Sequence, residues 1–333
     1  RLPHYLSDFS DGLHIKSLSS ITLLFFACLA PAVTFGGVMA VETGNQIGAV
    51  EMILASAVCG VVYALFSGQP LVILGGTGPL LIFTGILYRL CGDLGIPFLP
   101  TYAWVGLWTM VCMFLLSVTD ASCLMRYFTR FTDEIFAGLI SLIFVYEAVK
   151  ALVKIFQDLE VKQHHDTALL SLLLALGTFY LAHSLSHFRR SRYLRPKIRE
   201  FLADFGPAIA LTCMTLVALW LHGVYLESLP APARFGTTAE RAWRVDLLAV
   251  PMWVRGAAVV PALLATVLLF LDQNITARIV NSPGHRLQKG EAYHLDLAVV
   301  GALVGGCSLF GLPWLVAATV RSINHVRSLA TVE

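Results

Sequence analysis

An arginine stands in a short apolar stretch near the end of the 333-residue chain. The stretch reads Gly311-Leu312-Pro313-Trp314-Leu315-Val316-Ala317-Ala318-Thr319-Val320-Arg321-Ser322 and is too short to span a membrane alone. A charge in a membrane-like segment is costly and indicates a functional site by default. A guanidinium offers five N–H donors and a fixed positive charge, so the expected partner is an anion or a carboxylate. The alternative is that Arg321 extends to a membrane interface.

An earlier stretch repeats this pattern. It reads Gly68-Gln69-Pro70-Leu71-Val72-Ile73-Leu74-Gly75-Gly76-Thr77-Gly78-Pro79, and aligning Pro70 with Pro313 places Gly76 on Thr319 and Gly78 on Arg321. Two proline-marked, small-residue interruptions of apolar segments in corresponding places are the best sequence indication of a transporter binding site. Each stretch is predicted to begin extended and to continue as a half-helix from Gly78 or Ala318, since proline suits a first helical turn.

The N-termini of the two half-helices are expected to meet near the membrane midplane. Each offers unpaired backbone N–H groups and a partial positive charge, which together bind anions. Small residues at Gly75, Gly76, Ala317 and Ala318 allow close approach. The alternative is a pair of kinked helices held together by these small residues. The predicted anion-binding residues are Arg321, Thr319, Val320, Ala318, Thr77, Gly78, Gly76 and, from an earlier segment, Thr34.

Asp272 is the carboxylate expected at this site, because it lies well inside a long apolar segment. An ionised aspartate in a membrane must face a cavity or a partner. Thr276 lies one helical turn further on, on the same face. The two side chains could bind Na⁺ through their oxygen atoms, or Asp272 could pair with Arg321 and tune the charge of the site. A purely structural ion pair is the third interpretation.

The composition indicates a polytopic membrane protein. Hydrophobic residues make up 57% of the chain and charged residues 13%, whereas a soluble domain has about a quarter charged residues. Apolar runs of membrane-spanning length recur along the chain. The predicted segments are residues 18–41, 46–66, 71–90, 102–119, 131–156, 169–186, 201–225, 254–279, 294–309 and 314–329, of which the third and tenth combine an extended part with a half-helix.

Several other classes of function find no support in the sequence. No nucleophile elbow, P-loop or dinucleotide-binding loop appears, so neither an enzyme nor a cofactor other than Na⁺ is expected. The seven cysteines form no CxxC pair and lie in or beside apolar runs, which favours buried free thiols over a zinc site. The basic loop from Arg189 to Arg199 lies between two apolar segments, so it indicates membrane topology and not a nucleic-acid partner.

The same basic loop determines the predicted orientation. It carries six Lys or Arg residues within eleven positions, so we place it in the cytoplasm. The loops after the fourth and eighth segments carry further positive charges and lie on the same side, so even-numbered segments end in the cytoplasm. Seven segments precede the repeat of the pattern, and this odd number makes the second repeat inverted in the membrane.

The chain resembles the bicarbonate transporter family, which contains the anion exchangers, the sodium-coupled bicarbonate transporters and the borate transporters. The resemblance implies an all-α, polytopic, uracil-permease-like fold of fourteen segments in two inverted seven-segment repeats. It also implies a core domain and a gate domain, dimerisation through the gate, and an elevator-like motion. The matching runs reach from near the start of the chain to its end: Pro31–Gly37, Gly68–Leu71, Thr77–Leu80, Arg130–Phe136, Tyr293–Leu297 and Gly311–Ser322.

The resemblance also implies a division of the chain. Residues 1–120 would form core segments one to four, and residues 121–227 would form gate segments five to seven. Residues 228–252 would be an extracellular loop, and residues 253–333 would be core segments eight to ten. The second repeat is expected to be truncated, with segments eleven to fourteen absent. The expected location is the lipid bilayer of the plasma membrane, as a multi-pass homodimer.

The resemblance indicates two different coupling mechanisms. Arg321 is similar to the arginine of sodium-independent exchangers, whereas Asp272 with Thr276 is similar to the sodium-coupled members, in which the aspartate is linked to cation binding. The fixed charge of Arg321 stands where a bound Na⁺ would otherwise lie, which favours exchange of bicarbonate or carbonate with chloride. Na⁺-coupled transport, borate or H⁺/OH⁻ transport, and a non-transporting membrane anchor are the alternatives.

Overall fold

A computed structural model describes residues 5–119, 130–157, 165–188, 193–195, 198–199, 202–203, 206–221, 223–224, 226 and 236–330. The chain divides into two compact units, which are described separately. The larger unit comprises Arg1–Phe136 and Pro230–Glu333, and the smaller unit comprises Ala137–Leu229. The names core and gate for these parts of the chain remain predictions.

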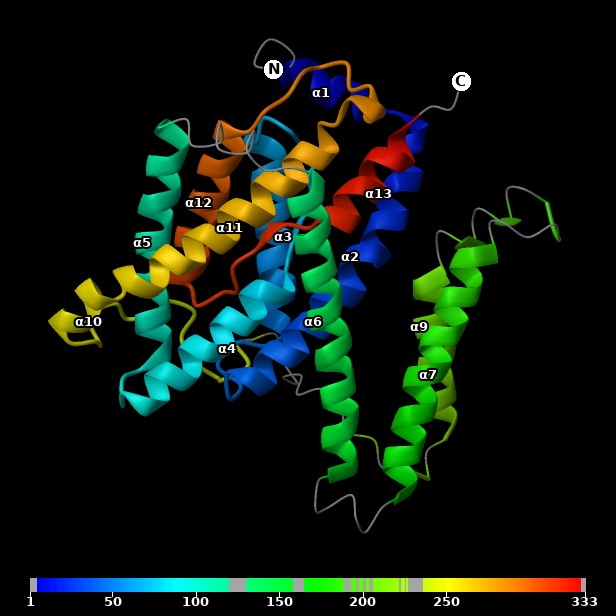
Figure 1. Cartoon of the computed structure of the whole chain (residues 1–333), viewed down its shortest axis with the longest axis horizontal. Helices are drawn as coiled ribbons and strands as arrows, with labels where there is room; N and C mark the ends of the chain where they lie inside the picture. The colour runs from blue at the N-terminus through cyan, green and yellow to red at the C-terminus, as the bar shows by residue number, and fades with distance from the viewer. Residues whose placement is uncertain are drawn as a thin grey trace. The chain divides into compact units, whose positions relative to one another are not determined.

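In its described residues, the larger unit is a bundle of helices with one two-stranded sheet at its centre (Figure 1). Its first part contains α1 (Tyr5–Asp11), α2 (Ile15–Glu42), α3 (Ala49–Phe66), β1 (Leu74–Gly75), α4 (Gly78–Asp93) and α5 (Phe98–Val118). Its second part contains α10 (Met252–Ala257), α11 (Val259–Val280), the short 3₁₀ helix η5 (Pro283–His285), α12 (His294–Leu309), β2 (Val316–Ala317) and α13 (Thr319–Leu329).

The two predicted extended-then-helical stretches are confirmed. Thr77 has an extended backbone and precedes α4, whose first turn contains Pro79, and the extended Ala318 precedes α13 in the same way. β1 and β2 pair in antiparallel fashion, with Leu74 opposite Ala317. In Figure 1, α4 (cyan) and α13 (red) run in opposite directions away from the place where the two extended segments meet.

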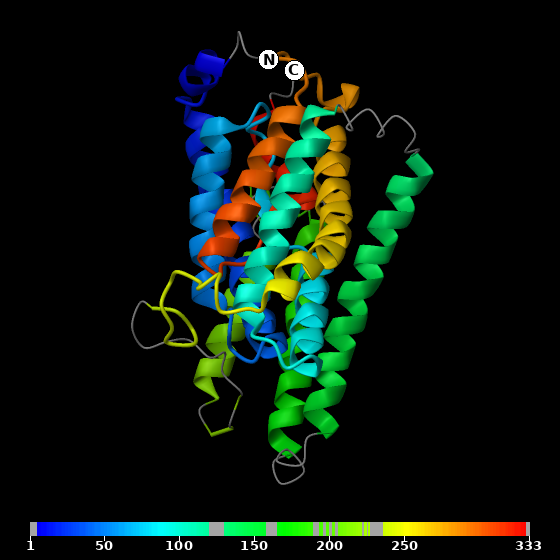
Figure 2. The same ribbon diagram turned by 90° about the vertical axis from the view of Figure 1, so that its left-hand side faces the viewer.

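Aromatic packing holds the chain that enters β2. The rings of Tyr102 and Trp314 stack with centroids 4.4 Å apart, and the Tyr102 hydroxyl accepts a hydrogen bond from the Trp314 backbone N–H at 3.2 Å. The Trp314 indole donates to the hydroxyl of Ser308, a residue of α12, at 2.7 Å. These contacts bind the entry to β2 to α5 and α12, which lie side by side in both views (Figure 2).

A loop from the second part of the chain is fastened to the start of α3. The buried carboxylate of Glu51 accepts hydrogen bonds from the backbone N–H groups of Gly48 at 3.0 Å and Thr238 at 2.7 Å. The Thr238 hydroxyl donates to the same carboxylate at 2.6 Å. Arg241, further along this loop, donates to the carbonyl of Gly311 at 2.8 Å. Burial lowers the pKa of the Arg241 guanidinium, and the nearby Glu51 carboxylate opposes this effect.

Prolines have different effects in two of the predicted segments. In the first, α2 continues through Pro31, as membrane helices can where neighbouring helices pack against them. The eighth segment is divided into α10 and α11 at Ala258. Pro261 has no N–H to donate to the carbonyl of Ala257, so the helix cannot continue regularly across this point.

The smaller unit consists mainly of helices, two of which pack along one another. α6 (Arg130–Gln157) begins within the range of the larger unit and continues into the smaller one. α7 (His165–His187) and α9 (Gly206–Trp220) are neighbours. Within the described residues of both units, five helical stretches are long and apolar enough to cross a membrane: Ser20–Glu42, Ala49–Phe66, Phe98–Val118, Asp166–His187 and Met252–Val280.

Candidate anion site

The two extended segments are held together by hydrogen bonds between the two halves of the larger unit. The Ala318 N–H donates to the carbonyl of Ile73 at 2.8 Å, and the Ile73 N–H donates to the Ser322 hydroxyl at 3.0 Å. The Ala317 N–H donates to the side-chain oxygen of Gln273 on α11 at 3.2 Å. Each bond satisfies a backbone group that would otherwise be costly to place within a membrane.

Both half-helices direct unpaired N–H groups toward this crossing. In α4 the first helical bond runs from Leu81 N–H to Thr77 O at 3.1 Å, which leaves the N–H groups of Gly78 and Leu80 outside the helical ladder. In α13 the first bond runs from Ser322 N–H to Ala318 O at 2.9 Å. The N–H groups of the three residues between them, which include Thr319 and Arg321, are therefore the free donors of the second half-helix.

Arg321 places its guanidinium directly over the other extended segment. Its Nη2 donates to the carbonyl of Gly76 at 3.2 Å, and the group also lies against the thiol of Cys28 on α2. A Cβ atom at Gly75 would overlap the guanidinium, so only glycine leaves room for this arrangement. Of the five N–H donors of the side chain, one is used in the contact with Gly76, and an anion can take others.

The ion pair between Asp272 and Arg321, which was one of the interpretations left open by the sequence, is absent from the ion pairs of the described residues. Asp272 instead accepts a hydrogen bond from the Thr77 hydroxyl at 2.9 Å. Thr77 does not use its side chain to cap α4, so its hydroxyl is available to the neighbouring helix α11. Of the interpretations of Asp272, direct pairing with Arg321 is therefore not the one seen in this conformation, and Arg321 keeps its charge for another partner.

Thr276 lies in a small group of oxygen atoms beside the N-terminus of α13. Its hydroxyl is 2.7 Å from the hydroxyl of Thr319 and donates to the carbonyl of Ala317 at 3.4 Å. Asp272 and Thr276 are both buried and lie on the same helix, one turn apart. The hydroxyl of Thr276 is bonded within the protein, whereas the Asp272 carboxylate accepts one hydrogen bond among the described residues, so its remaining lone pairs are chemically suitable for a monovalent cation.

The structure brings most of the predicted site residues together. Thr77, Gly78, Thr319 and Arg321 lie at the two N-termini, and Gly76 contributes its carbonyl. The prediction for Ala318 is corrected, because its N–H is bonded to Ile73 and cannot bind an anion.

The remaining predicted residues lie differently. Val320 directs an exposed side chain away from the core, so only its backbone N–H can contribute to the site. Thr34 is an exposed residue of α2, and its place in the site remains a prediction. Gln273 and Ser322 were not predicted, although both are polar residues within apolar or small-residue stretches. A polar side chain within such a stretch needs a hydrogen-bond partner, and this was the sequence signal that could have indicated their role in holding the extended segments together.

Comparison with known proteins assigns the chain. Residues 1–165 and 157–333 match the sequence profile described as the HCO3- transporter integral membrane domain. The chain belongs to the bicarbonate transporter family. Mouse anion exchange protein 3 is 40% identical over 365 residues, covering 99% of this chain and 30% of that protein. Rat band 3 anion transport protein is 39% identical over 349 residues, covering 99% of this chain and 38% of that protein.

A solved structure independently confirms the fold of this family member. The transmembrane domain of the cyanobacterial bicarbonate transporter BicA aligns with a TM-score of 0.66 over 95% of this chain and 78% of that domain, at 16% identity. The predicted all-α, uracil-permease-like membrane fold is therefore correct, and the chain is an integral membrane domain. The chain spans about a third of the length of the two curated relatives.

Proposed function

We propose that the protein transports bicarbonate or carbonate across the membrane through the site between α4 and α13. The observation that carries this proposal is the guanidinium of Arg321, which is joined to no carboxylate among the described residues and stands beside two sets of free helical N–H groups. A fixed positive charge and convergent N–H donors form a binding site for a small anion. The names of the similar proteins agree with this substrate class.

Exchange with chloride, independent of Na⁺, is the form of transport that we propose. Arg321 supplies a permanent positive charge, so a bound cation is not needed to balance the incoming anion. Asp272 reaches Thr77 and so acts on the site through the N-terminus of α4, where its negative charge tunes anion affinity. An elevator-like motion of this site, dimerisation through the gate and a cytoplasmic location for the loops after even-numbered segments belong to the same proposal.

Na⁺-coupled transport is the second candidate, because one observation favours it. The carboxylate of Asp272 is free of Arg321, and Thr276, one helical turn further along α11, has its hydroxyl 2.7 Å from that of Thr319. A carboxylate with several neutral oxygens is the type of ligand set that Na⁺ accepts. In this form of transport the cation would offset the charge of Asp272 and the anion would bind Arg321.

The full-length protein in proteoliposomes tests the proposed site. Arg321→Ala is expected to abolish bicarbonate uptake, whereas Arg327→Ala, an exposed residue two turns later in α13, is expected to retain it. Both variants should show wild-type thermal stability in detergent. Near-normal uptake by Arg321→Ala would refute the assignment of the site.

Ion replacement distinguishes the mechanisms. Bicarbonate uptake that requires chloride inside the vesicles and is unchanged when external Na⁺ is replaced supports exchange. An absolute Na⁺ requirement establishes the coupled mechanism instead. Flux of borate or of H⁺/OH⁻ without bicarbonate would assign a different substrate to the same site. Absence of saturable anion binding would support the alternative that the protein is a non-transporting membrane anchor.

A further inference from the structure

Two cysteines from distant parts of the chain meet inside the larger unit. Cys59 in the middle of α3 and Cys307 near the end of α12 have sulfur atoms 3.5 Å apart, although 248 residues separate them in the sequence. Both are free thiols with exposed fractions of 0% and 5%. Among the described cysteines, this is the only pair whose sulfur atoms are in contact.

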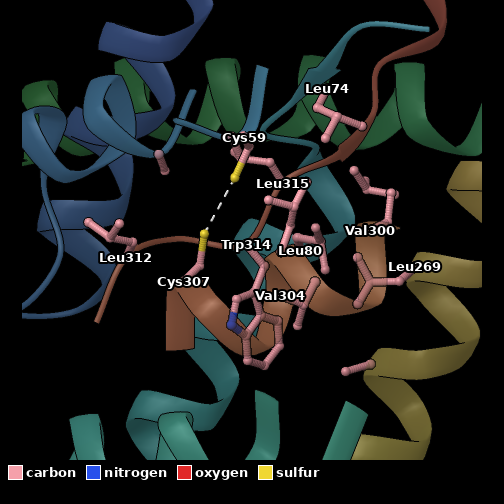
Figure 3. Packing of buried hydrophobic residues seen from close by; sticks show 14 of the residues in the cluster. Cys59, Leu74, Leu80, Leu269, Val300, Val304, Cys307, Leu312, Trp314 and Leu315 are labelled. Carbon is pink, nitrogen blue, oxygen red and sulfur yellow. Dashed lines mark hydrogen bonds between the residues drawn. The ribbon is translucent and has the colours of Figure 1, made fainter. Parts of the chain in front are cut away.

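The surroundings of the pair are apolar and tightly packed. Figure 3 shows the two sulfur atoms facing each other, with Leu312, Trp314 and Leu315 of the following stretch nearby. Buried single cysteines usually behave as small apolar side chains. Two thiols in contact differ, because a reaction at one sulfur places an electrophile directly beside a second nucleophile.

We propose that Cys59 and Cys307 form an oxidisable dithiol site, which a small neutral peroxide converts to a disulfide between α3 and α12. Hydrogen peroxide first oxidises one thiol to a sulfenic acid and releases one water. The sulfur of the second thiol then forms the S–S bond and displaces the sulfenic hydroxyl group, which leaves as a second water with the thiol proton. Two thiols thus lose two hydrogen atoms, and one peroxide becomes two waters.

The geometry requires only a small movement. A disulfide bond is about 2.05 Å long, so the two sulfur atoms must approach by about 1.5 Å. The effect reaches the site region, because the carbonyl of Cys307 accepts the N–H of Leu312 at 2.8 Å in the turn that leads toward β2. The disulfide would therefore fasten this turn to α3 by a covalent bond.

The first test uses the full-length protein in vesicles treated with hydrogen peroxide. After alkylation under denaturing conditions, proteolysis and mass spectrometry, a peptide pair linking Cys59 to Cys307 is expected, with a mass about 2 Da below that of the two thiol peptides. Dithiothreitol should restore the separate peptides. The thermal midpoint of the oxidised protein should rise by at least about 5 °C, since the bond closes a very long loop.

Two variants make the test specific. In Cys59→Ala the sulfenic acid of Cys307 has no second thiol to react with, so dimedone should label it. In the wild-type protein the sulfenic acid is consumed by disulfide formation, so no dimedone adduct is expected. Cys91→Ala removes another buried thiol and should leave the disulfide unchanged. Recovery of Cys59 and Cys307 as alkylated thiols, as sulfinic or sulfonic acids, or in disulfides with other cysteines would each overturn the proposal.

Discussion

Replacement of Gly75 by alanine tests whether the position of Arg321 determines anion affinity. The backbone of Gly75 does not have a positive φ, so alanine is compatible with its conformation. The added Cβ would overlap the Arg321 guanidinium, which must leave its place over β1 and its hydrogen bond to Gly76. Gly60→Ala is the control, because Gly60 is an exposed residue of α3 outside the site and an added Cβ would meet no other atom within 4 Å.

The size of the effect follows from the hydrogen bond that the displaced Arg321 guanidinium can no longer donate to the bound anion. A hydrogen bond to a charged group contributes about 1.5–3 kcal/mol, and each 1.4 kcal/mol corresponds to a tenfold change in affinity. Gly75→Ala should therefore raise the half-saturation concentration for bicarbonate by roughly 10- to 150-fold, whereas Gly60→Ala should stay within about threefold of wild type. The assay is initial bicarbonate flux into chloride-loaded proteoliposomes as a function of external bicarbonate.

One result would refute this reasoning. If Gly75→Ala lowers the thermal midpoint but keeps the wild-type half-saturation concentration, the glycine serves only packing. The guanidinium would then not bind the transported anion in the observed position.

Three further substitutions have defined outcomes. Asp272→Asn should lower the half-saturation concentration for chloride about fivefold, because it removes a repulsion of about 1 kcal/mol, and an unchanged or higher value would contradict this. Glu51→Ala leaves three donors without their acceptor and should cost about 3 kcal/mol in thermal unfolding, whereas the exposed Glu240→Ala should be neutral. For Lys289, burial is the largest single effect and lowers the side-chain pKa, but the contacts with Asp11 and Asp8 of α1 together outweigh it and raise the pKa overall. The contribution of Lys289 to stability is therefore fully present below the usual lysine pKa and is lost only as the pH rises through the raised value. Lys289→Met should therefore speed the hydrogen exchange of backbone amides in α1 at pH 7, whereas Arg286→Met should not. Equal exchange rates in the two variants would show that the ion pairs of Lys289 with Asp8 and Asp11 do not hold α1 in place.

Local chemistry accounts for why much of the fold could be predicted. Pro79 and the neighbouring glycines permit a helix to start but not to extend backwards, so the change from extended chain to half-helix is encoded within a few residues. The segment from His294 to Leu309 was predicted with the bounds of α12, because polar or turn-forming residues flank its apolar run. Arg321 could be predicted as a site residue, since a charge in such a stretch is costly unless it binds a partner.

The partners of the side chains could not be predicted in the same way. Asp272 was expected beside Arg321 because opposite charges attract, but the hydroxyl of Thr77 lies within its reach and satisfies it without a second charge. The hydrogen bond from the Ala317 N–H to Gln273 depends on how α11 is rotated about its axis relative to β2. The hydrophobic periodicity of the sequence does not determine this rotation. Such contacts join residues more than forty positions apart and are determined by packing, so no local pattern contains them.

The mutual bonding of the two extended segments has a consequence for biosynthesis. The Ile73 N–H donates to the hydroxyl of Ser322, which is synthesised 249 residues later. The Ile73 carbonyl accepts its hydrogen bond from the N–H of Ala318, which is also synthesised late. Until that part of the chain enters the bilayer, the first half of the site carries polar backbone groups with no protein partner, which is unfavourable in lipid. The nascent first repeat should thus depend on an insertase or chaperone to shelter this segment, and nonsense mutations before β2 should yield products that the cell recognises as unfinished and degrades.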